Sequence, residues 1–483
     1  MMKIMRTAGV FAVALLMSLT AHSAINILPN PGSVERLGGA CSVRLAGEVD
    51  FLPLNEGIVP EGYELEVTPG GVVVRASSES GRFYAKQTLQ QLVDHAAGGE
   101  IPCVRIVDQP KYAWRSFMID SGRQFQRLET IKGLLDRMAM LKMNVFHWHL
   151  TENDGWRIEI KKYPKLTEVG AFVADGEEQH GFYTQKDIRE IVAYAAERHI
   201  TVVPEIDVPG HSEAALKAYP SLTCSREAPK PVKKGFSPYL YCGGRDSVVE
   251  FLCNVLDEVC ELFPSEYIHI GGDEAPKSEW KKCTDCQAKI KEMGLKDEHE
   301  LQIELTNRLA RHLAAKGRKA ICWGDVVTLP GQELEKNVVV HWWNYRRGGD
   351  KALREGIKRG LPVIANSNYY TYLNFPQKHT WRNYRKDRLF DFQTCYEKNP
   401  SDIRNPTAQQ SKALLGMGCC LWTDHGLTEE WLDRRLYPRI YAMAEQMWST
   451  AERLPFTDFK NRVYAKQPIL QELGIGGDWD EEY

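Results

Sequence analysis

Hydrophobic and polar positions follow two different patterns along this chain, and the change comes near residue 110. From residue 25 to about residue 109, short stretches alternate between polar and apolar side chains, as in residues 63–67 and 72–75, before a helix-like stretch at residues 81–95. Alternation with a period of two is typical of a strand that buries one face. We therefore predict a small α+β domain over residues 24–109.

After residue 110, apolar runs of strand length alternate with longer amphipathic segments. Helical periodicity fills most of the gaps, for example in residues 128–140, 184–198, 248–262, 299–316 and 435–448. The strand candidates are residues 115–120, 143–149, 200–205, 266–270, 319–323, 337–342, 361–366 and 415–422. Eight strands with intervening helices predict a (β/α)8 TIM barrel over residues 110–483, with enlarged loops. A doubly wound open sheet is the competing arrangement, but the Gly-rich turn of a dinucleotide binder is absent after the first strand candidate.

Polar and aromatic residues follow the end of every strand candidate, where a TIM barrel carries its functional groups. A single Trp or Asp at such a place is most often a core residue or a helix cap, so the recurrence at all eight ends is what indicates a site. These residues are, in chain order, Arg123, His149, Glu152, Asp207, His211, Asp273, Glu274, Trp323, Asp325, Trp343, Tyr372, Trp422 and Asp424.

The adjacent acids Asp273 and Glu274 follow an apolar run and a Gly-Gly break. Two carboxyl groups at the exit of a buried strand are unfavourable unless they perform acid/base chemistry. Burial near Trp323 would favour the neutral form of Glu274 and suit it to protonate a leaving oxygen. Asp273 cannot easily be the opposing carboxylate, because neighbours approach from one wall whereas a retaining pair flanks the bond at about 5–5.5 Å. Another group must supply the nucleophile.

The aromatic and charged residues at the strand ends indicate a sugar as the ligand. Trp323, Trp343 and Trp422 offer flat surfaces for the apolar faces of a ring, while Arg123 and Asp424 offer charged partners for its hydroxyl groups. This combination predicts a pyranose pocket and cleavage of a glycosidic bond.

Charge and motifs argue against several other ligand classes. The chain has 61 basic and 64 acidic residues, for a net charge of −3, so no electrostatic footprint for nucleic acid or an anionic membrane is visible. Gly271-Gly272 is followed by acids that would repel a phosphate, which speaks against a nucleotide cofactor. His147 and His149 lack a carboxylate at an obvious metal-ligand spacing, so we expect no metal there.

The cysteines allow two local pairings. Cys224 and Cys242 flank a loop rich in Pro and Lys that a disulfide could close, with a stabilisation on the order of 3 kcal/mol. Cys283 and Cys286 form a C-x-x-C motif. A zinc site would need a second such motif or paired histidines nearby, and none appears, so a local disulfide or two free thiols is the prediction.

The first residues have the features of an export signal. Lys3 and Arg6 precede an apolar stretch at residues 8–19, which ends in the small-residue run at residues 20–24. This pattern predicts a secretory signal peptide over residues 1–23 and a periplasmic or secreted protein. No later stretch approaches the roughly 20 apolar residues that a membrane span needs, and we expect no membrane partner.

Several motifs together resemble glycoside hydrolase family 20, the β-N-acetylhexosaminidases. The resemblance covers essentially the whole chain after the signal peptide, including the small domain before the barrel. The segments that carry it are WRSFMIDSGRQF (114–125), NVFHWHLTENDGWR (144–157), VVPEIDVPGHSEA (202–214), HIGGDE (269–274) and CLWTD (420–424). It implies an exo-acting enzyme that hydrolyses terminal β-linked GlcNAc or GalNAc from a glycan or oligosaccharide, without a cofactor.

The resemblance also implies roles for individual residues. Glu274 would be the general acid/base, while Asp273 would orient the 2-acetamido group of the substrate, whose carbonyl oxygen attacks C1 to form an oxazolinium intermediate. Tyr372 would hydrogen-bond the acetamide oxygen. The substrate contacts implied are Arg123 to the 3- and 4-hydroxyls, Trp422 on the ring, Trp323 and Trp343 around the acetamido methyl, and His211 supporting the acid. Three positions, Glu152, Asn374 and Asp424, stand where the family more often has Asp, Asp and Glu, and the shorter Asp424 bears on the preference between gluco and galacto sugars.

Two other functions stay open at this point. One is a catalytically silent glycan-binding protein with the same pocket, although such a protein has no use for two neighbouring carboxyl groups. The other is a barrel glycosidase whose nucleophile is a distant carboxylate such as Asp325 or Asp424, and it would cleave sugars that lack the 2-acetamido group.

Overall fold

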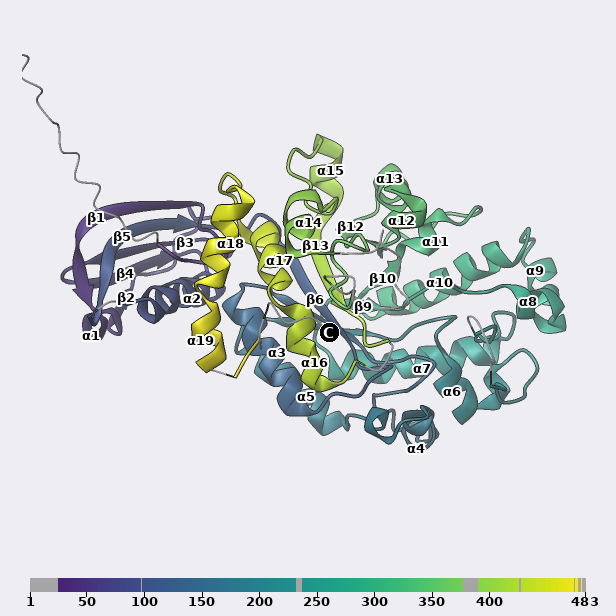
Figure 1. The fold of residues 1–483 in the computed structure, drawn as a ribbon. Coiled ribbons are helices and arrows are strands. Elements are labelled where there is room, and N and C mark those ends of the chain that lie inside the picture. Colours follow the sequence, from purple (N-terminus) through teal and green to yellow (C-terminus); the bar gives the residue numbers. More distant parts are fainter. Residues whose placement is uncertain are drawn as a thin grey trace, which may run out of the picture.

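The computed structural model describes residues 25–96, 98–231, 237–375, 377, 390–424, 427–472, 474–476 and 479. The predicted signal peptide lies outside the described residues. A five-stranded sheet comes first in the chain and a closed barrel follows, and Figure 1 shows them side by side with α18 (Phe456–Tyr464) and α19 (Gln467–Glu472) between them. Nothing among the described helices is both long and apolar enough to cross a membrane.

The N-terminal domain has the α+β architecture predicted from its alternating pattern. Its strand order is β1-β5-β3-β4-β2, and the buried positions of β3 alternate with half-buried ones. Helix α2 packs on the sheet with Tyr84, Ala85 and Leu89 inward. The elements are β1 (Ser33–Ser42), α1 (Val43–Ala46), β2 (Val49–Phe51), β3 (Tyr63–Thr68), β4 (Gly71–Ala76), α2 (Glu79–Asp94) and β5 (Glu100–Asp108).

The eight predicted strands close into a parallel barrel, which confirms the predicted TIM fold. Their order around the barrel follows the chain, from the first to the eighth and back to the first. They are β6 (Trp114–Asp120), β7 (Val145–His149), β8 (Thr201–Glu205), β9 (Tyr267–His269), β10 (Lys319–Trp323), β11 (Val338–Trp342), β12 (Val363–Ala365) and β13 (Leu414–Leu421). The open-sheet alternative is therefore wrong.

Amphipathic helices connect the strands, and α3 shows why they form. Its buried residues Ile131, Leu134, Leu135 and Met138 recur at the spacing of one helical face. The longer connecting helices are α3 (Leu128–Met140), α5 (Gln185–Ala196), α7 (Asp246–Leu262), α10 (Glu298–Ala315), α13 (Lys351–Lys358) and α17 (Arg439–Trp448). Shorter elements occupy the loops: α4 (Lys165–Glu168), η1 (Gly170–Phe172), η2 (Glu177–Gln179), α6 (Glu213–Ala218), η3 (Pro220–Leu222), α8 (Ser278–Lys282), α9 (Thr284–Glu292), α11 (Gly324–Thr328), α12 (Tyr345–Gly348), α14 (Phe392–Lys398), α15 (Ala408–Ala413) and α16 (Glu429–Leu436).

One helix prediction is wrong in its extent. The periodic segment 435–448 was predicted as a single helix, but α16 ends at Leu436 and α17 begins at Arg439. Pro438 lies between them. A proline lacks the N–H that continues a helix, and its ring disfavours helical geometry in the preceding residue.

The two domains share buried polar contacts. The Nζ of Lys142, from the barrel, lies 2.8 Å from Oδ2 of Asp108, and both side chains are fully buried. The indole N–H of Trp448 donates to the same carboxylate at 2.9 Å. If the domains moved apart, each buried charge would lose its partner, which is strongly unfavourable. The ion pair therefore holds one domain in a fixed position on the other.

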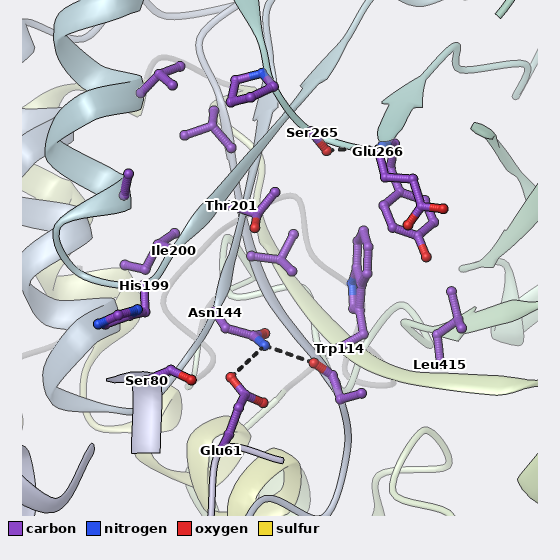
Figure 2. A pocket seen from close by; sticks show the side chains of 17 residues that line it. Glu61, Ser80, Trp114, Asn144, His199, Ile200, Thr201, Ser265, Glu266 and Leu415 are labelled. Atoms are coloured by element: carbon purple, nitrogen blue, oxygen red, sulfur yellow. Dashed lines mark hydrogen bonds between the residues drawn. The ribbon is translucent and has the colours of Figure 1, made fainter. Parts of the chain in front are cut away.

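The barrel has a polar end and an apolar end. Side chains near the amino-terminal ends of the strands form an apolar layer, which includes Trp114, Val145, Val203, Ile321 and Val339. A cavity of about 650 Å³ opens at this end beside the domain junction, as Figure 2 shows, where Asn144 donates a hydrogen bond to Glu61. This cavity lies away from the carboxyl ends of the strands, where the predicted site residues stand.

Candidate active site

A smaller cavity of about 160 Å³ lies at the carboxyl ends of the strands. Eleven of the thirteen strand-end residues that the sequence indicated for the site line it, and Trp323 and Asp325 are the exceptions. The lining residues are Arg123, His149, Glu152, Asp207, His211, Asp273, Glu274, Trp343, Tyr372, Asn374, Phe375, Trp422 and Asp424. Side chains far apart in the sequence therefore meet in one place, as the barrel fold requires.

The turn after β9 presents the two acids to the cavity. Gly271 and Gly272 have φ of +65° and +111°, which a glycine adopts without strain. The N–H of Gly272 donates to Oδ1 of Asp207 at 3.0 Å, so the turn is anchored to the loop after β8. Glu274 itself has φ of +42°, a conformation that costs about 1–3 kcal/mol in a residue other than glycine. Strain of this kind is typical of residues held for function.

The environment of Glu274 keeps its carboxyl group protonated to higher pH than usual. Burial raises its pKa, and the neighbouring carboxylate of Asp273 raises it further. Burial likewise raises the pKa of Asp273. The side chain of Glu274 is still 29% exposed, so it can exchange protons with solvent or with a bound molecule. A partly exposed acid with a raised pKa is suited to general acid catalysis.

His211 stands between the carboxyl groups. Its Nδ1 lies 2.5 Å from Oε1 of Glu152, and its Nε2 lies 3.7 Å from Oδ2 of Asp273 and 3.8 Å from Oε2 of Glu274. Burial lowers the pKa of His211, but the carboxylates of Glu152 and Asp273 outweigh burial and raise it well above its ordinary value. The imidazolium form therefore offsets part of the negative charge in the cavity.

Arg123 and Glu152 form a second charged group on the opposite side of His211. The guanidinium of Arg123 contacts Oδ2 of Asp120 at 2.7 Å and Oε1 of Glu152 at 2.5 Å. Its carbon lies 5.2 Å above the ring of Trp422. Burial raises the pKa of Glu152, but Arg123 and His211 lower it to well below the usual value. Arg123 is thus fixed as a cation with part of its side chain open to the cavity.

Aromatic side chains form the remaining wall. The rings of Trp343 and Tyr372 are nearly parallel, with their centroids 6.3 Å apart, and Phe375 continues the wall beyond Tyr372. The indole N–H of Trp343 donates to Oδ2 of Asp325 at 2.5 Å, which fixes the orientation of its ring. Such surfaces favour the apolar faces of a sugar.

The floor of the cavity is a buried polar network around Glu205. Its Oε2 lies 2.8 Å from Nε2 of His147 and 2.7 Å from Nδ1 of His149, while the indole N–H of Trp323 donates to Oε1 at 2.7 Å. Trp323 is 1% exposed and stacks on His341, with the ring centroids 4.4 Å apart. It lies beneath the cavity, in contact distance of Trp422 but not on the lining.

Known proteins identify the family. The model of the glycosyl hydrolase family 20 catalytic domain matches residues 112–451, and the model of domain 2 of that family matches residues 47–109. Together these matches cover most of the chain and both parts of the fold. The chain belongs to glycosyl hydrolase family 20. The resemblance seen in the sequence motifs is thereby confirmed, and so is the expectation of a glycoside hydrolase.

Curated relatives agree with this assignment. A β-hexosaminidase of Porphyromonas gingivalis is 40% identical over 424 residues, covering 85% of this chain and 53% of that protein, so the chain spans about half the length of that relative. A β-hexosaminidase of Akkermansia muciniphila is 34% identical over 459 residues and covers 92% of this chain and 90% of that protein.

Solved structures give the same result for the fold. A β-N-acetylhexosaminidase of Bacteroides fragilis superposes with a TM-score of 0.85 at 45% identity, over 93% of this chain and 96% of that chain. An exo-β-N-acetylglucosaminidase of Vibrio harveyi in complex with N-acetylglucosamine superposes with a TM-score of 0.83 at 28% identity, over 93% and 78% of the two chains.

Sequence reasoning missed two features of the site in this family 20 protein. Phe375 lines the cavity, but it carries no distinguishing sequence signal. Glu205 was also missed, although it ends a predicted strand and could have been suspected on that ground. No carboxylate stands near His147 and His149 in sequence spacing, but the barrel brings Glu205 to them from the neighbouring strand.

The Glu205 cluster is better explained by hydrogen bonding than by metal ligation. His147, Glu205 and His269 have ligand atoms within 4.8 Å of one another, as do Asp207, His211 and Asp273. However, each oxygen of Glu205 already contacts two nitrogen groups of the surrounding rings. In the second set, Asp273 lies next to His211, and Asp207 accepts a hydrogen bond from the N–H of Gly272.

The glycine turn provides a test of the site's construction. A Cβ on Gly271 would lie 1.7 Å from Oδ1 of Asp207, whereas a Cβ on Gly294, with a similar φ of +66°, would meet nothing within 4 Å. We expect Gly294→Ala to lower the free energy of unfolding by about 1–2 kcal/mol, the strain of the left-handed conformation. Gly271→Ala should lower it by more than about 3 kcal/mol and also reduce kcat/KM, because Asp207 must move. Urea denaturation and initial rates measure both effects, and equal losses in the two variants would contradict the proposed anchor.

Proposed function

We propose that this protein is an exo-acting β-N-acetylhexosaminidase that removes terminal, non-reducing β-linked GlcNAc or GalNAc from glycans or oligosaccharides. The observation that carries the proposal is the adjacent pair Asp273 and Glu274 at the end of β9, facing a small cavity with an aromatic wall. At about 160 Å³ the cavity is below the usual range of about 300–1,000 Å³ for larger ligands, which favours one terminal ring over a longer segment. The names of the relatives and structural neighbours support the same activity.

The reaction begins with protonation by Glu274. Its raised pKa supports the role of a general acid that hands its proton to the leaving glycosidic oxygen as the bond to C1 breaks. The carbonyl oxygen of the substrate's own 2-acetamido group attacks C1 from the opposite face and forms a cyclic oxazolinium ion. Asp273 accepts the amide N–H and stabilises the positive charge that develops on that group.

Water completes the cycle. Glu274, now a carboxylate, removes a proton from a water molecule. The oxygen of that water attacks C1, and the bond between C1 and the acetamido oxygen of the cyclic ion breaks. The acetamido group is regenerated and Glu274 recovers its proton. Two displacements at C1 give net retention of configuration. Adjacent acids suit this chemistry because both act on the same sugar, one on the bond and one on the amide.

The remaining residues of the site position the sugar. Arg123 is a cation fixed by Asp120 and Glu152, which supports its role at the 3- and 4-hydroxyls. Trp422 would carry the ring. The other proposed contacts are Trp343 to the acetamido methyl, Tyr372 to the acetamide oxygen, Asp424 to the 4- or 6-hydroxyl, and His211 holding the two acids in place. Trp323, which the resemblance placed at the acetamido methyl, lies beneath the cavity and would support this wall from below.

We also propose that the enzyme acts outside the cytoplasm, in the periplasm or the medium. The support is the basic and apolar pattern of residues 1–23, which precede the described part of the chain.

Removal of the proposed acid gives the first test. Glu274→Gln keeps the shape of the side chain but cannot donate a proton, so kcat on an aryl β-N-acetylglucosaminide should fall by about 10²–10⁴-fold. Glu266→Gln, at an exposed acid at the other end of β9, is the control and should retain activity. A Glu274→Gln variant with wild-type turnover would show that Glu274 is not the general acid.

The origin of the nucleophile gives the second test. If the acetamido oxygen attacks C1, aryl β-glucosides should be nearly inert beside aryl β-GlcNAc and β-GalNAc, and thiazoline mimics of the cyclic ion should inhibit. A protein nucleophile such as Asp325 or Asp424 predicts comparable cleavage of the glucoside. A glycosyl ester on the protein, detected by mass spectrometry, would decide for that alternative.

The pH dependence provides a third test. As pH rises through the raised pKa of Glu274, the acid loses its proton and kcat/KM should fall. His211 and Arg123 oppose this shift, while Asp273 supports it. In Asp273→Asn the repulsion is gone and the pKa of Glu274 is lower, so the basic limb of the residual activity should move to lower pH. An unchanged limb would show that a different group controls it.

A further inference from the structure

Four cysteines from two loops meet near the active-site end of the barrel. Cys224 and Cys242 lie in the loop after β8, and Cys283 and Cys286 lie in the loop after β9. Their sulfur atoms all lie within 4.8 Å of one another, and all four thiols are free. Three of the side chains are buried and that of Cys224 is partly exposed. The disulfide between Cys224 and Cys242 suggested by the sequence is therefore not present.

The fold brings each pair together in a different way. Thr223 and Tyr241 form an antiparallel bridge, and the backbone N–H of Cys242 donates to the carbonyl of Leu222 at 2.9 Å. The segments that carry Cys224 and Cys242 therefore run side by side, and the two sulfur atoms lie within 4.8 Å of each other. Cys283 precedes the first residue of α9 and Cys286 is the third residue of that helix. The start of a helix favours thiolates, because its N–H groups carry partial positive charge. The sequence indicated each pair separately, but not that the two pairs meet.

The backbones of the two loops pack tightly around the sulfur atoms. A Cβ on Gly244 would lie 2.4 Å from the backbone of Asp285 and Cys286, and one on Gly243 would lie 2.9 Å from the ring of Trp280. The indole N–H of Trp280 donates to the carbonyl of Tyr241 at 2.9 Å. The approach of the two loops thus depends on a Gly-Gly pair directly after Cys242.

The distances between sulfur atoms fit a tetrahedron. They are 3.6 Å for Cys242 and Cys286, 3.8 Å for Cys242 and Cys283, and 3.9 Å for Cys224 and Cys286. Four sulfur ligands at about 2.3 Å from a zinc ion lie about 3.8 Å from one another. Disulfides join sulfur atoms in pairs at about 2.05 Å. Here Cys242 and Cys286 each have two sulfur neighbours at nearly equal distances, which is the pattern of ligands around one centre.

We propose that Cys224, Cys242, Cys283 and Cys286 bind one structural Zn²⁺ ion. Four thiolates in a closed, mostly buried set leave no position for water or substrate, so the ion would hold the fold and take no part in the reaction. The earlier objection to zinc, that no second C-x-x-C motif is present, fails because the second pair is assembled by a bridge between distant residues.

Such an ion would join the two loops that carry the acids. The loop after β8 also contains Asp207 and His211, and the loop after β9 contains Asp273 and Glu274. Figure 1 shows α8 and α9 at the edge of the molecule far from the N-terminal sheet, where these loops extend beyond the barrel. In the described structure their outer parts are also linked by Asp285, which contacts Arg226 at 3.4 Å and Arg245 at 3.5 Å. Zinc would add a stronger link than these partly exposed ion pairs.

The direct test measures metal and thiols in the purified full-length protein. We expect about one equivalent of zinc per chain by inductively coupled plasma mass spectrometry. After denaturation without reductant, alkylation and peptide mass mapping should find all four cysteines as free thiols. Removal of the ion with a strong chelator should lower the melting temperature by at least ~5 °C, and Zn²⁺ should restore it. Disulfides among these four residues, or purified protein that contains iron or no metal, would overturn the proposal.

Variants and a second metal make the test specific. Cys283→Ser/Cys286→Ser should lose the bound zinc, whereas Cys253→Ser/Cys260→Ser, at two partly exposed cysteines of α7 outside the cluster, should retain it. If the first variant fails to fold, Co²⁺ exchanged into the wild-type protein provides the answer. Tetrahedral thiolate ligation gives intense visible absorption of Co²⁺, and a weak octahedral spectrum would contradict the proposed ligand set.

Discussion

The site depends on the electrostatic balance around His211. Asp207, Asp273 and Glu274 all face the same small volume, and burial of several carboxyl groups together is unfavourable unless protons or cations compensate. Burial raises the pKa of Asp207 well above its ordinary value, and Asp273 raises it further, so Asp207 favours its neutral form. The imidazolium of His211 supplies one positive charge at the centre. With these compensations, Asp273 and Glu274 can remain close enough for the proposed action on one sugar.

The barrel beneath the site supports this balance. Glu205 contacts nitrogen groups of His147 and His149 on β7, of His269 on β9 and of Trp323 on β10, which fixes the ring that forms the floor. Below it, the apolar layer at the amino-terminal end excludes water from the barrel interior. Reactive groups and strained backbone can therefore be concentrated at one end, because the other end is packed for stability.

The loops after β8 and β9 extend beyond the barrel and pack against each other. Their contacts combine the hydrogen bond of Gly272 to Asp207, the packing of Gly244 against α9 and the four-cysteine cluster. Each contact joins one loop to the other. The geometry of the acids is thus linked to groups well outside the cavity, which is a physical reason for a metal-binding cluster without any catalytic part.

The sequence by itself determined the strand positions, the order of the domains and eleven lining residues, because strand periodicity and the polar residues at strand ends are local patterns. It also carried the HIGGDE motif. Only the tertiary structure decided which distant groups meet. Glu205 contacts His147 across a pair of parallel strands, and Trp323 lies beneath the cavity and not on its wall. Cys224 lies beside Cys286, although the two residues belong to different loops. Such encounters depend on barrel closure and loop packing, and neither is encoded in the spacing of residues along the chain.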